Sequence, residues 1–157
     1  MKQEMEATLL ESQNYAVIEQ MVEAFSTQDL DRVMSLFSDD ADYFDVQGWV
    51  NKGNQYHGKS AIRRINKALF ERLPPHRYED AIILVSGNQA HANWTLVVDS
   101  PWSSKPIKVN GGDYFELENG KVTLKNAWLQ SKGLLRLAVI VYGLFPFLRR
   151  QPVHANS

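Results

Sequence analysis

Residues 107–117, IKVNGGDYFEL, have the alternating pattern of a β-strand. Taken two at a time, one row of side chains is mostly apolar, and its members are Ile107, Val109, Gly111, Asp113, Phe115 and Leu117. Because side chains alternate between the two faces of a strand, this row is predicted to face the core. Asp113 lies in the middle of the row, and a buried carboxylate is costly unless it is paired, hydrogen-bonded or neutralised.

The sequence around this strand predicts a sheet built from hairpins. SGN separates two strand-like runs at 76–85 and 89–99, and ENG separates 107–117 from another at 121–130. Both connections have turn-forming residues. Apolar residues at helical spacing predict helices over about 4–25, 26–37 and 60–73, with a strand at 43–50 and a loop at 51–59. Helices followed by hairpin strands indicate an α+β fold with helices on one face of an antiparallel sheet.

Composition limits the function classes. The chain has 157 residues, a formal net charge of −1 and no cysteine. The mixed charge disfavours nucleic-acid binding, which normally needs a basic face. Without cysteine there is no disulfide and no thiolate metal site. Because the first residues contain no apolar signal-peptide core, we expect a cytoplasmic protein.

The C-terminal residues differ from the rest. Residues 134–148 are apolar nearly throughout, but too few to span a bilayer, which takes roughly 20 helical residues. We expect one domain over 1–133 and an extension over 134–157 that packs on the domain or on a partner subunit. Attachment to a membrane surface is the alternative, because Arg149 and Arg150 follow the apolar run. It is not favoured, since Arg136 interrupts the run.

A second acidic residue lies in a similar row. Tyr43, Asp45, Gln47 and Trp49 share one face of the predicted strand at 43–50. If both rows turn inward, two carboxylates enter one apolar cavity, where one can act as base and the other, protonated, can donate a hydrogen bond to an enolate. Two structural alternatives stay open: Asp45 binds backbone amides near Gly48, and Asp113 is a core carboxylate satisfied locally.

Three segments together resemble a known superfamily. AFSTQDLDRVMSLFSDDADYFD, YHGKSAIRRI, and GGDYFELENGKV followed by a Trp resemble the nuclear transport factor two-like proteins, within their SnoaL-like polyketide-cyclase and ketosteroid-isomerase branch. The resemblance implies a cone-shaped fold, in which a curved sheet wraps around N-terminal helices and leaves a deep apolar pocket. It also implies a homodimer formed across the sheet.

The resemblance to ketosteroid isomerase also implies roles for single residues. Asp45 takes the position of the proton-shuttling base, and Asp113 that of the protonated acid in the oxyanion hole. The tyrosine that is the other oxyanion donor is replaced by Met21, whose thioether cannot donate a hydrogen bond. Loss of one such donor typically lowers the rate about 10²–10³-fold.

These observations favour a pocket for a small apolar molecule. We expect a cofactor-independent isomerase or cyclase that uses Asp45 and Asp113; the alternative is a non-catalytic binding module of the same fold. No histidine pair has metal-ligand spacing, so neither a metal nor a cofactor is expected. The predicted pocket residues are Met21, Tyr43, Trp49, His57, Trp94, Phe115 and Trp128.

Overall fold

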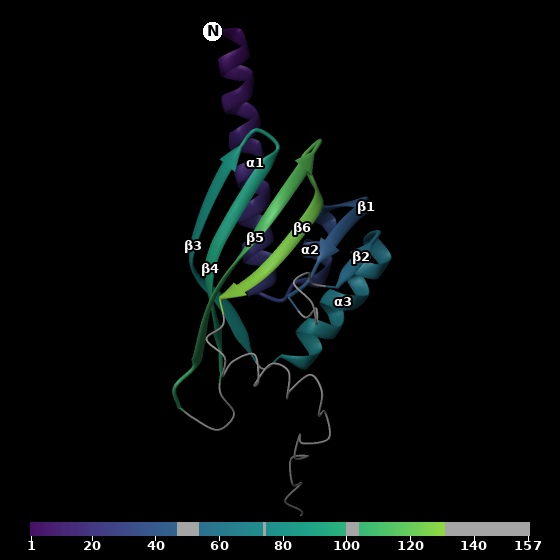
Figure 1. The fold of residues 1–157 in the computed structure, drawn as a ribbon, viewed down its shortest axis with the longest axis vertical. Coiled ribbons are helices and arrows are strands. Elements are labelled where there is room, and N and C mark those ends of the chain that lie inside the picture. The colour runs from purple at the N-terminus through teal and green to yellow at the C-terminus, as the bar shows by residue number, and fades with distance from the viewer. Residues whose placement is uncertain (47–53, 74, 100–103, 131–157) are drawn as a thin grey trace, which may run out of the picture.

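The computed structural model describes residues 1–46, 54–73, 75–99 and 104–130. Three helices and six strands lie in these ranges (Figure 1). In chain order they are α1 (Lys2–Ser26), α2 (Leu30–Leu36), β1 (Phe37–Phe44), β2 (Gln55–His57), α3 (Lys59–Arg72), β3 (His76–Ser86), β4 (Gln89–Val98), β5 (Ile107–Glu118) and β6 (Lys121–Gln130).

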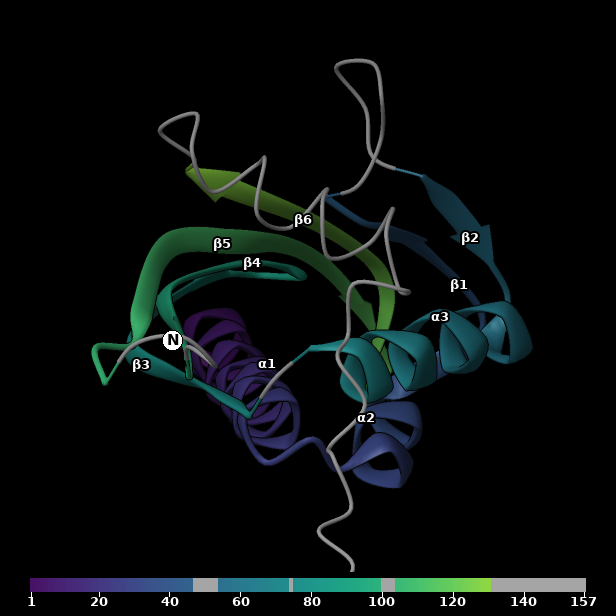
Figure 2. The ribbon, with the colours of Figure 1, turned by 90° about the horizontal axis from the view of Figure 1, so that it is seen from below.

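All six strands belong to one curved sheet, in the order β2-β1-β6-β5-β4-β3. Neighbouring strands are antiparallel except β1 and β6, which run parallel. The sheet bends strongly without closing on itself, as Figure 2 shows. The expected α+β fold with a curved, mixed sheet is confirmed.

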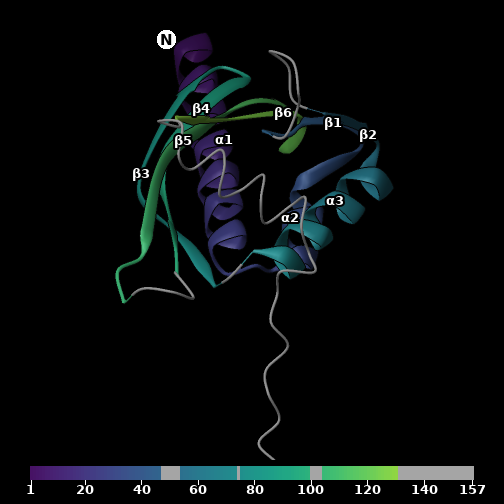
Figure 3. The same cartoon turned by 60° about the horizontal axis from the view of Figure 1, so that its bottom comes forward.

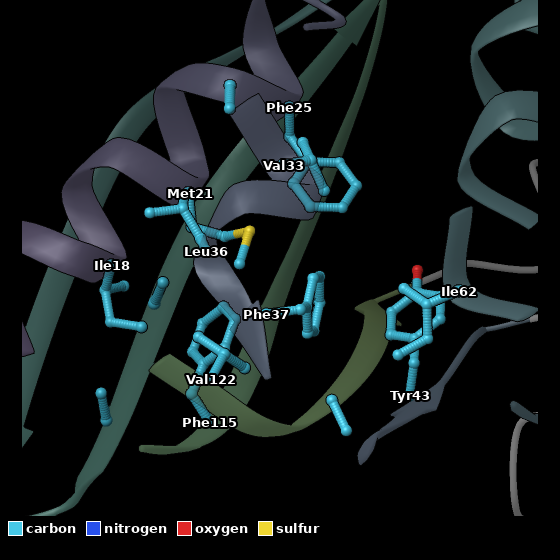
Figure 4. Packing of buried hydrophobic residues seen from close by; sticks show 14 of the residues in the cluster. Ile18, Met21, Phe25, Val33, Leu36, Phe37, Tyr43, Ile62, Phe115 and Val122 are labelled. Carbon is cyan, nitrogen blue, oxygen red and sulfur yellow. The ribbon is translucent and has the colours of Figure 1, made fainter. Parts of the chain in front are cut away.

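The helices lie on the concave face of this sheet. α1 packs on β3 and β4, whereas α3 packs on β1 and β2 and against α2 (Figure 3). The first turns of α1 extend beyond the sheet. The core forms between the layers and contains Ile18 and Met21 of α1, Ile62 of α3, and inward side chains of the sheet (Figure 4).

Local signals explain the turns and one helix start. The Asp29 side chain accepts a hydrogen bond from the Arg32 backbone amide at 3.0 Å and caps α2. Gly87 has φ 56° in the β3–β4 turn, and Asn119 and Gly120 have φ 51° and 72° in the β5–β6 turn. Two successive positive φ angles are typical of tight hairpin turns. Both predicted hairpins are confirmed.

Two predictions near β1 are wrong. The strand begins at Phe37 rather than Tyr43, because Phe37, Ala41 and Tyr43 are buried while Asp39 and Asp40 project outward. The acidic run therefore lies within a strand instead of breaking one. β2 lies in the segment predicted to be a loop, where Tyr56 pairs with Tyr43.

The alternation predicted for β5 is confirmed. Val109, Gly111, Asp113, Phe115 and Leu117 are all buried, whereas Lys108 and Asn110 are exposed. The two glycines make no bulge. A Cβ on Gly111 would lie 2.6 Å from the Trp94 ring, and a Cβ on Gly112 would lie 2.7 Å from the Trp128 ring. Each glycine thus makes room for one indole, on opposite faces of the sheet.

Two other strands contain irregularities that reverse their alternation. In β3, Glu79 pairs with Thr95 and Ile82 with Asn93, so an extra residue is accommodated near Asp80, whose φ is 55°. In β6, Leu124 pairs with Glu116 and Val122 with Leu117, which leaves Thr123 as the extra residue. An extra residue in one strand changes which side chains face inward.

The predicted extension at 134–157 lies outside the described residues. Within the described ranges, no helix is both long and apolar enough to cross a membrane.

Candidate active site

A buried ion pair lies on the concave face of the sheet. Asp113 of β5 and Lys125 of β6 are 6% and 4% exposed, and the Lys125 ammonium donates to Asp113 Oδ1 at 2.5 Å. The other carboxylate oxygen, Oδ2, accepts the indole N–H of Trp94 at 2.9 Å. Gly111 permits this second contact, since any side chain there would displace the Trp94 ring.

Aromatic rings surround the ammonium group. Lys125 Nζ lies 4.8 Å from the ring centre of Tyr43, 5.0 Å from that of Phe25 and 5.8 Å from that of Phe115. Tyr43 and Phe115 are its register partners on the two neighbouring strands. Cation–π attraction at these distances stabilises the charged amine where water is excluded.

This environment differs from the one expected for Asp113. An acid that donates to an oxyanion needs a proton on one oxygen, but both Asp113 oxygens accept hydrogen bonds from groups that can only donate. The arrangement suits an ionised carboxylate paired with a cation. The alternative of a satisfied core carboxylate fits the contacts better, although its partners are Lys125 and Trp94 rather than local backbone.

Asp45 directly follows β1 and is 6% exposed. Its Oδ1 accepts the Asn54 backbone amide at 3.0 Å, and its Oδ2 accepts the Tyr56 hydroxyl at 3.1 Å. The alternative in which Asp45 binds a backbone amide is therefore seen, at Asn54. The same contacts hold a carboxylate at the end of the strand that contains Tyr43.

Two phenols lie within the electrostatic reach of Asp113. Burial raises the pKa of Tyr43 well above its usual value, and the charges of Asp113 and Asp45 raise it further. Burial, and then Asp113, also raise the pKa of Tyr78 of β3. The Tyr78 ring meets Trp94 edge-on at 4.7 Å, and Tyr43 lies over Lys125. Both phenols hence stay protonated at neutral pH and keep an O–H to donate.

The other predicted pocket residues lie partly in the interior and partly on the outer face of the sheet. Met21, Trp94 and Phe115 are buried, at 1%, 7% and 0% exposure. Trp128 is 46% exposed and lies over Gly112 on the outer face, opposite to Asp113, so it does not line the interior. The prediction for this residue is corrected accordingly. Trp49 and its neighbour Gln47 lie outside the described residues.

His57 also lies apart from the buried ion pair. Its side chain is 70% exposed, and Nδ1 is 3.0 Å from Asp42 Oδ1. It borders an open groove of about 480 Å³, whose lining residues are Met34, Asp39, His57, Gly58, Lys59, Ser60 and Arg63. Charged residues of the groove are already paired, Lys59 with Asp39 and Arg63 with Asp31. Among the residues described, no cluster of three or more His, Asp or Glu side chains could hold a metal ion.

Lys125 and Tyr78 were not identified from the sequence. Simple alternation from Val122 points Lys125 outward, and alternation back from Val85 and Ile83 points Tyr78 outward. The extra residues at Thr123 and near Asp80 turn both side chains inward. One feature of the sequence does indicate an inward Lys125. Ala127 and Leu129, which alternate with it on the same face of the strand, are apolar.

Solved structures with the same fold have little sequence in common with this chain. A protein from Xanthomonas campestris described as a "putative polyketide cyclase" superposes with a TM-score of 0.65 at 14% sequence identity. The match covers 76% of this chain and 92% of that one. A "putative ketosteroid isomerase" from Kribbella flavida gives 0.63 at 14%, over 77% and 80%. A nuclear transport factor two-like protein of unknown function from Mesorhizobium loti gives 0.63 at 16%, over 77% and 93%. These likenesses show the fold.

Sequence comparison identifies the family. No curated protein matches the chain. The family model for the SnoaL-like domain matches residues 18–125, a segment that includes α2, α3, β1 to β5 and Lys125 itself. The chain belongs to the SnoaL-like family, within the nuclear transport factor two-like superfamily.

Proposed function

We propose that this protein binds a small apolar carbonyl compound inside the cone and catalyses a proton transfer on it, as an isomerase or cyclase without a cofactor. The observation that carries the proposal is the position of Tyr43, whose ring lies over Lys125, the partner of Asp113, and stacks on Tyr56, the partner of Asp45. Both buried carboxylates also raise the pKa of Tyr43. Perturbed titratable groups in an apolar interior are typical of acid–base sites.

Asp45 is the proposed base. The neutral Asn54 amide and the neutral Tyr56 hydroxyl donate to its two oxygens. An ionised carboxylate can act as a general base and accept a proton from carbon. Asp113 is less suited to this role, because Lys125 already neutralises its charge.

A non-catalytic binding module is the second candidate. The absence of a donor at Met21 and the engagement of both Asp113 oxygens favour it. In this case the aromatic interior would hold the ligand, and Asp45 would only fix the end of β1. Both candidate functions require ligand binding, but only the first requires catalysis, so one experiment can distinguish them.

The experiment uses 2-tetralone, an apolar ketone with exchangeable α-protons. Proton NMR in D₂O would follow their exchange, and saturation transfer from the protein would report binding. We expect the native protein to bind 2-tetralone and to accelerate exchange, with the acceleration reduced by about 10²-fold or more in Asp45→Asn. Asp39→Asn is the matched control, because this β1 carboxylate is 95% exposed.

Binding without accelerated exchange would support the binding module and refute catalysis on this ketone class. Absence of binding would refute both candidates for this ligand class.

The assembly and location complete the proposal. The proposed location is the cytoplasm. A homodimer across the outer face of the sheet is supported by a row of exposed apolar side chains. Ile82 and Trp128 lie in one register row across β3 to β6, and Leu84 lies in the next, at 61%, 46% and 63% exposure. Exposed apolar patches of this kind mark interfaces.

A further inference from the structure

The interior contains polar groups that the ion pair does not engage. Within the described part of the chain, the hydroxyls of Tyr43 and Tyr78 make no hydrogen bond. Asn66 of α3 is 0% exposed, and its Oδ1 has no partner, while its Nδ2 donates to the Ile62 carbonyl at 3.0 Å. Buried polar groups are normally satisfied, so the free acceptor of Asn66 needs an explanation, and the two phenol hydroxyls remain free to donate.

Asn66 lies on a face of α3 whose two ends approach the two phenols. Ile62, Asn66 and Phe70 are four residues apart and therefore share one face of α3. Figure 4 shows the Tyr43 hydroxyl on the side of the core where Ile62 lies. At the other end of this face, Phe70 meets Phe25 at 5.7 Å, and Phe25 meets Tyr78 at 6.4 Å. Asn66 thus lies midway along this face, between the end near Tyr43 and the end near Tyr78.

The two phenols also interact electrostatically. The charge that would form on Tyr78 contributes to the raised pKa of Tyr43, after that of Asp113. Asp113 acts on both phenols, while its own oxygens are occupied by Trp94 and Lys125. Tyr43 and Tyr78 are therefore available to donate to a third group.

We propose that Tyr43 and Tyr78 donate hydrogen bonds to one oxygen of the ligand, and that Asn66 Oδ1 accepts the proton of that oxygen when it is a hydroxyl. The ligand class is an apolar compound with an enol, phenol or enolate oxygen. A hydroxyl oxygen can accept two hydrogen bonds and donate one, which matches the three free groups. This inference rests on the proposed function. It assigns the binding of the ligand oxygen to Tyr43 and Tyr78 instead of to Asp113 and a donor at the position of Met21.

The test compares two probes that differ in a single group. 2-Naphthol has the enol-like oxygen, and 2-methylnaphthalene has a methyl group in its place. Equilibrium dialysis would measure both dissociation constants for the native protein and for Tyr43→Phe, Tyr78→Phe and Asn66→Leu. Tyr114→Phe is the control, because its hydroxyl donates to Glu116 at 2.8 Å on the outer face.

We expect the native protein to bind 2-naphthol more tightly than 2-methylnaphthalene. Each of the three variants should weaken 2-naphthol binding by about five- to tenfold, the effect of one hydrogen bond, and change 2-methylnaphthalene binding less than twofold. Tyr114→Phe should change neither. Because the free hydroxyls have no partner to lose, Tyr43→Phe and Tyr78→Phe should melt at or above the native temperature.

Equal binding of both probes, or naphthol affinity unchanged in the two tyrosine variants, would overturn this inference and leave the apolar pocket intact. A lower melting temperature in both tyrosine variants would also overturn it, since the hydroxyls would then bond within the protein. If neither probe bound to the native protein, the proposed function would fail together with it.

Discussion

Lys125 reaches Asp113 because β6 contains one extra residue where it pairs with β5. Asp113 pairs with Ala127, and Phe115 with Lys125, so the ion pair joins diagonal positions two residues apart. The extra residue at Thr123 gives Lys125 its inward direction, and the Thr123 hydroxyl donates to the Glu116 carbonyl at 3.2 Å. The bulge is thereby a condition for the charge pair at the centre of the core.

Breaking this pair should be costly. Lys125→Met leaves Asp113 buried without its cation, and loss of one partner of a buried pair typically costs about 3–5 kcal/mol. Urea unfolding would measure the free-energy change. Lys108→Met is the control: Lys108 pairs with Glu79 at 3.1 Å but is 57% exposed, and exposed pairs contribute about 0–1 kcal/mol. Similar effects of the two substitutions would contradict a buried, functioning ion pair.

Replacing both partners should restore part of the loss. In Lys125→Met with Asp113→Asn, no unpaired charge remains in the core, so we expect the double variant to be more stable than Lys125→Met alone. Additive losses in a double-mutant cycle would show that the two side chains do not interact.

Gly111→Ala should displace Trp94. The new Cβ would lie 2.6 Å from the indole ring and 2.7 Å from the Trp128 carbonyl oxygen, which is too close for a side chain that cannot move. We expect a loss of about 1–3 kcal/mol in stability and a changed emission spectrum of Trp94. Asn110→Ala, at the exposed neighbouring position, is the control for the strand. An unaltered spectrum and stability in Gly111→Ala would refute the proposed close contact.

Alkaline pH should destabilise the protein through its buried phenols. In the unfolded chain a tyrosine ionises near a pKa of about 10. The folded pKa values of Tyr43 and Tyr78 are higher, so their contribution to stability is complete below about pH 10 and is lost as the pH rises from there towards the folded values. Urea unfolding between pH 8.5 and 11 should show a smaller loss in the double Tyr43→Phe, Tyr78→Phe variant. If the free energy of unfolding fell equally with pH in the native protein and in the double variant, the raised pKa values of Tyr43 and Tyr78 would be contradicted.

The proposed dimer makes a prediction about the outer face. Leu84→Lys places a charge in the exposed apolar row, and it should lower the mass measured by light scattering from that of a dimer to that of a monomer. Ser86→Lys, also exposed on β3, should leave the dimer intact. A native protein that is already monomeric at the same concentration would refute the dimer.

The sequence predicts those parts of the fold in which local pattern and burial agree. The row through Asp113 follows simple alternation, and Gly87, Asn119 and Gly120 lie in turns that their residue types predict. The parallel pairing of β1 with β6 was not predictable, because it joins strands about 80 residues apart and has no local signal.

The site was harder to predict than the fold. The burial of Asp45 and Asp113 was predicted, since acidic residues in apolar rows are conspicuous. Lys125 and Tyr78 were not, because irregular pairing in β6 and β3 reverses the inward phase. A protonated Asp113 was expected because its surroundings were predicted to be apolar. Lys125, which pairs with Asp113, was not recognised as part of those surroundings.

The most direct test of the central claim is a crystal structure of the native protein with 2-naphthol. The account predicts that the naphthol oxygen lies within hydrogen-bonding distance, about 2.5–3.0 Å, of both the Tyr43 and Tyr78 hydroxyls, with its ring among the aromatic side chains around Lys125. Naphthol found only in the groove between Met34 and Arg63, or with its oxygen away from both tyrosines, would contradict the account.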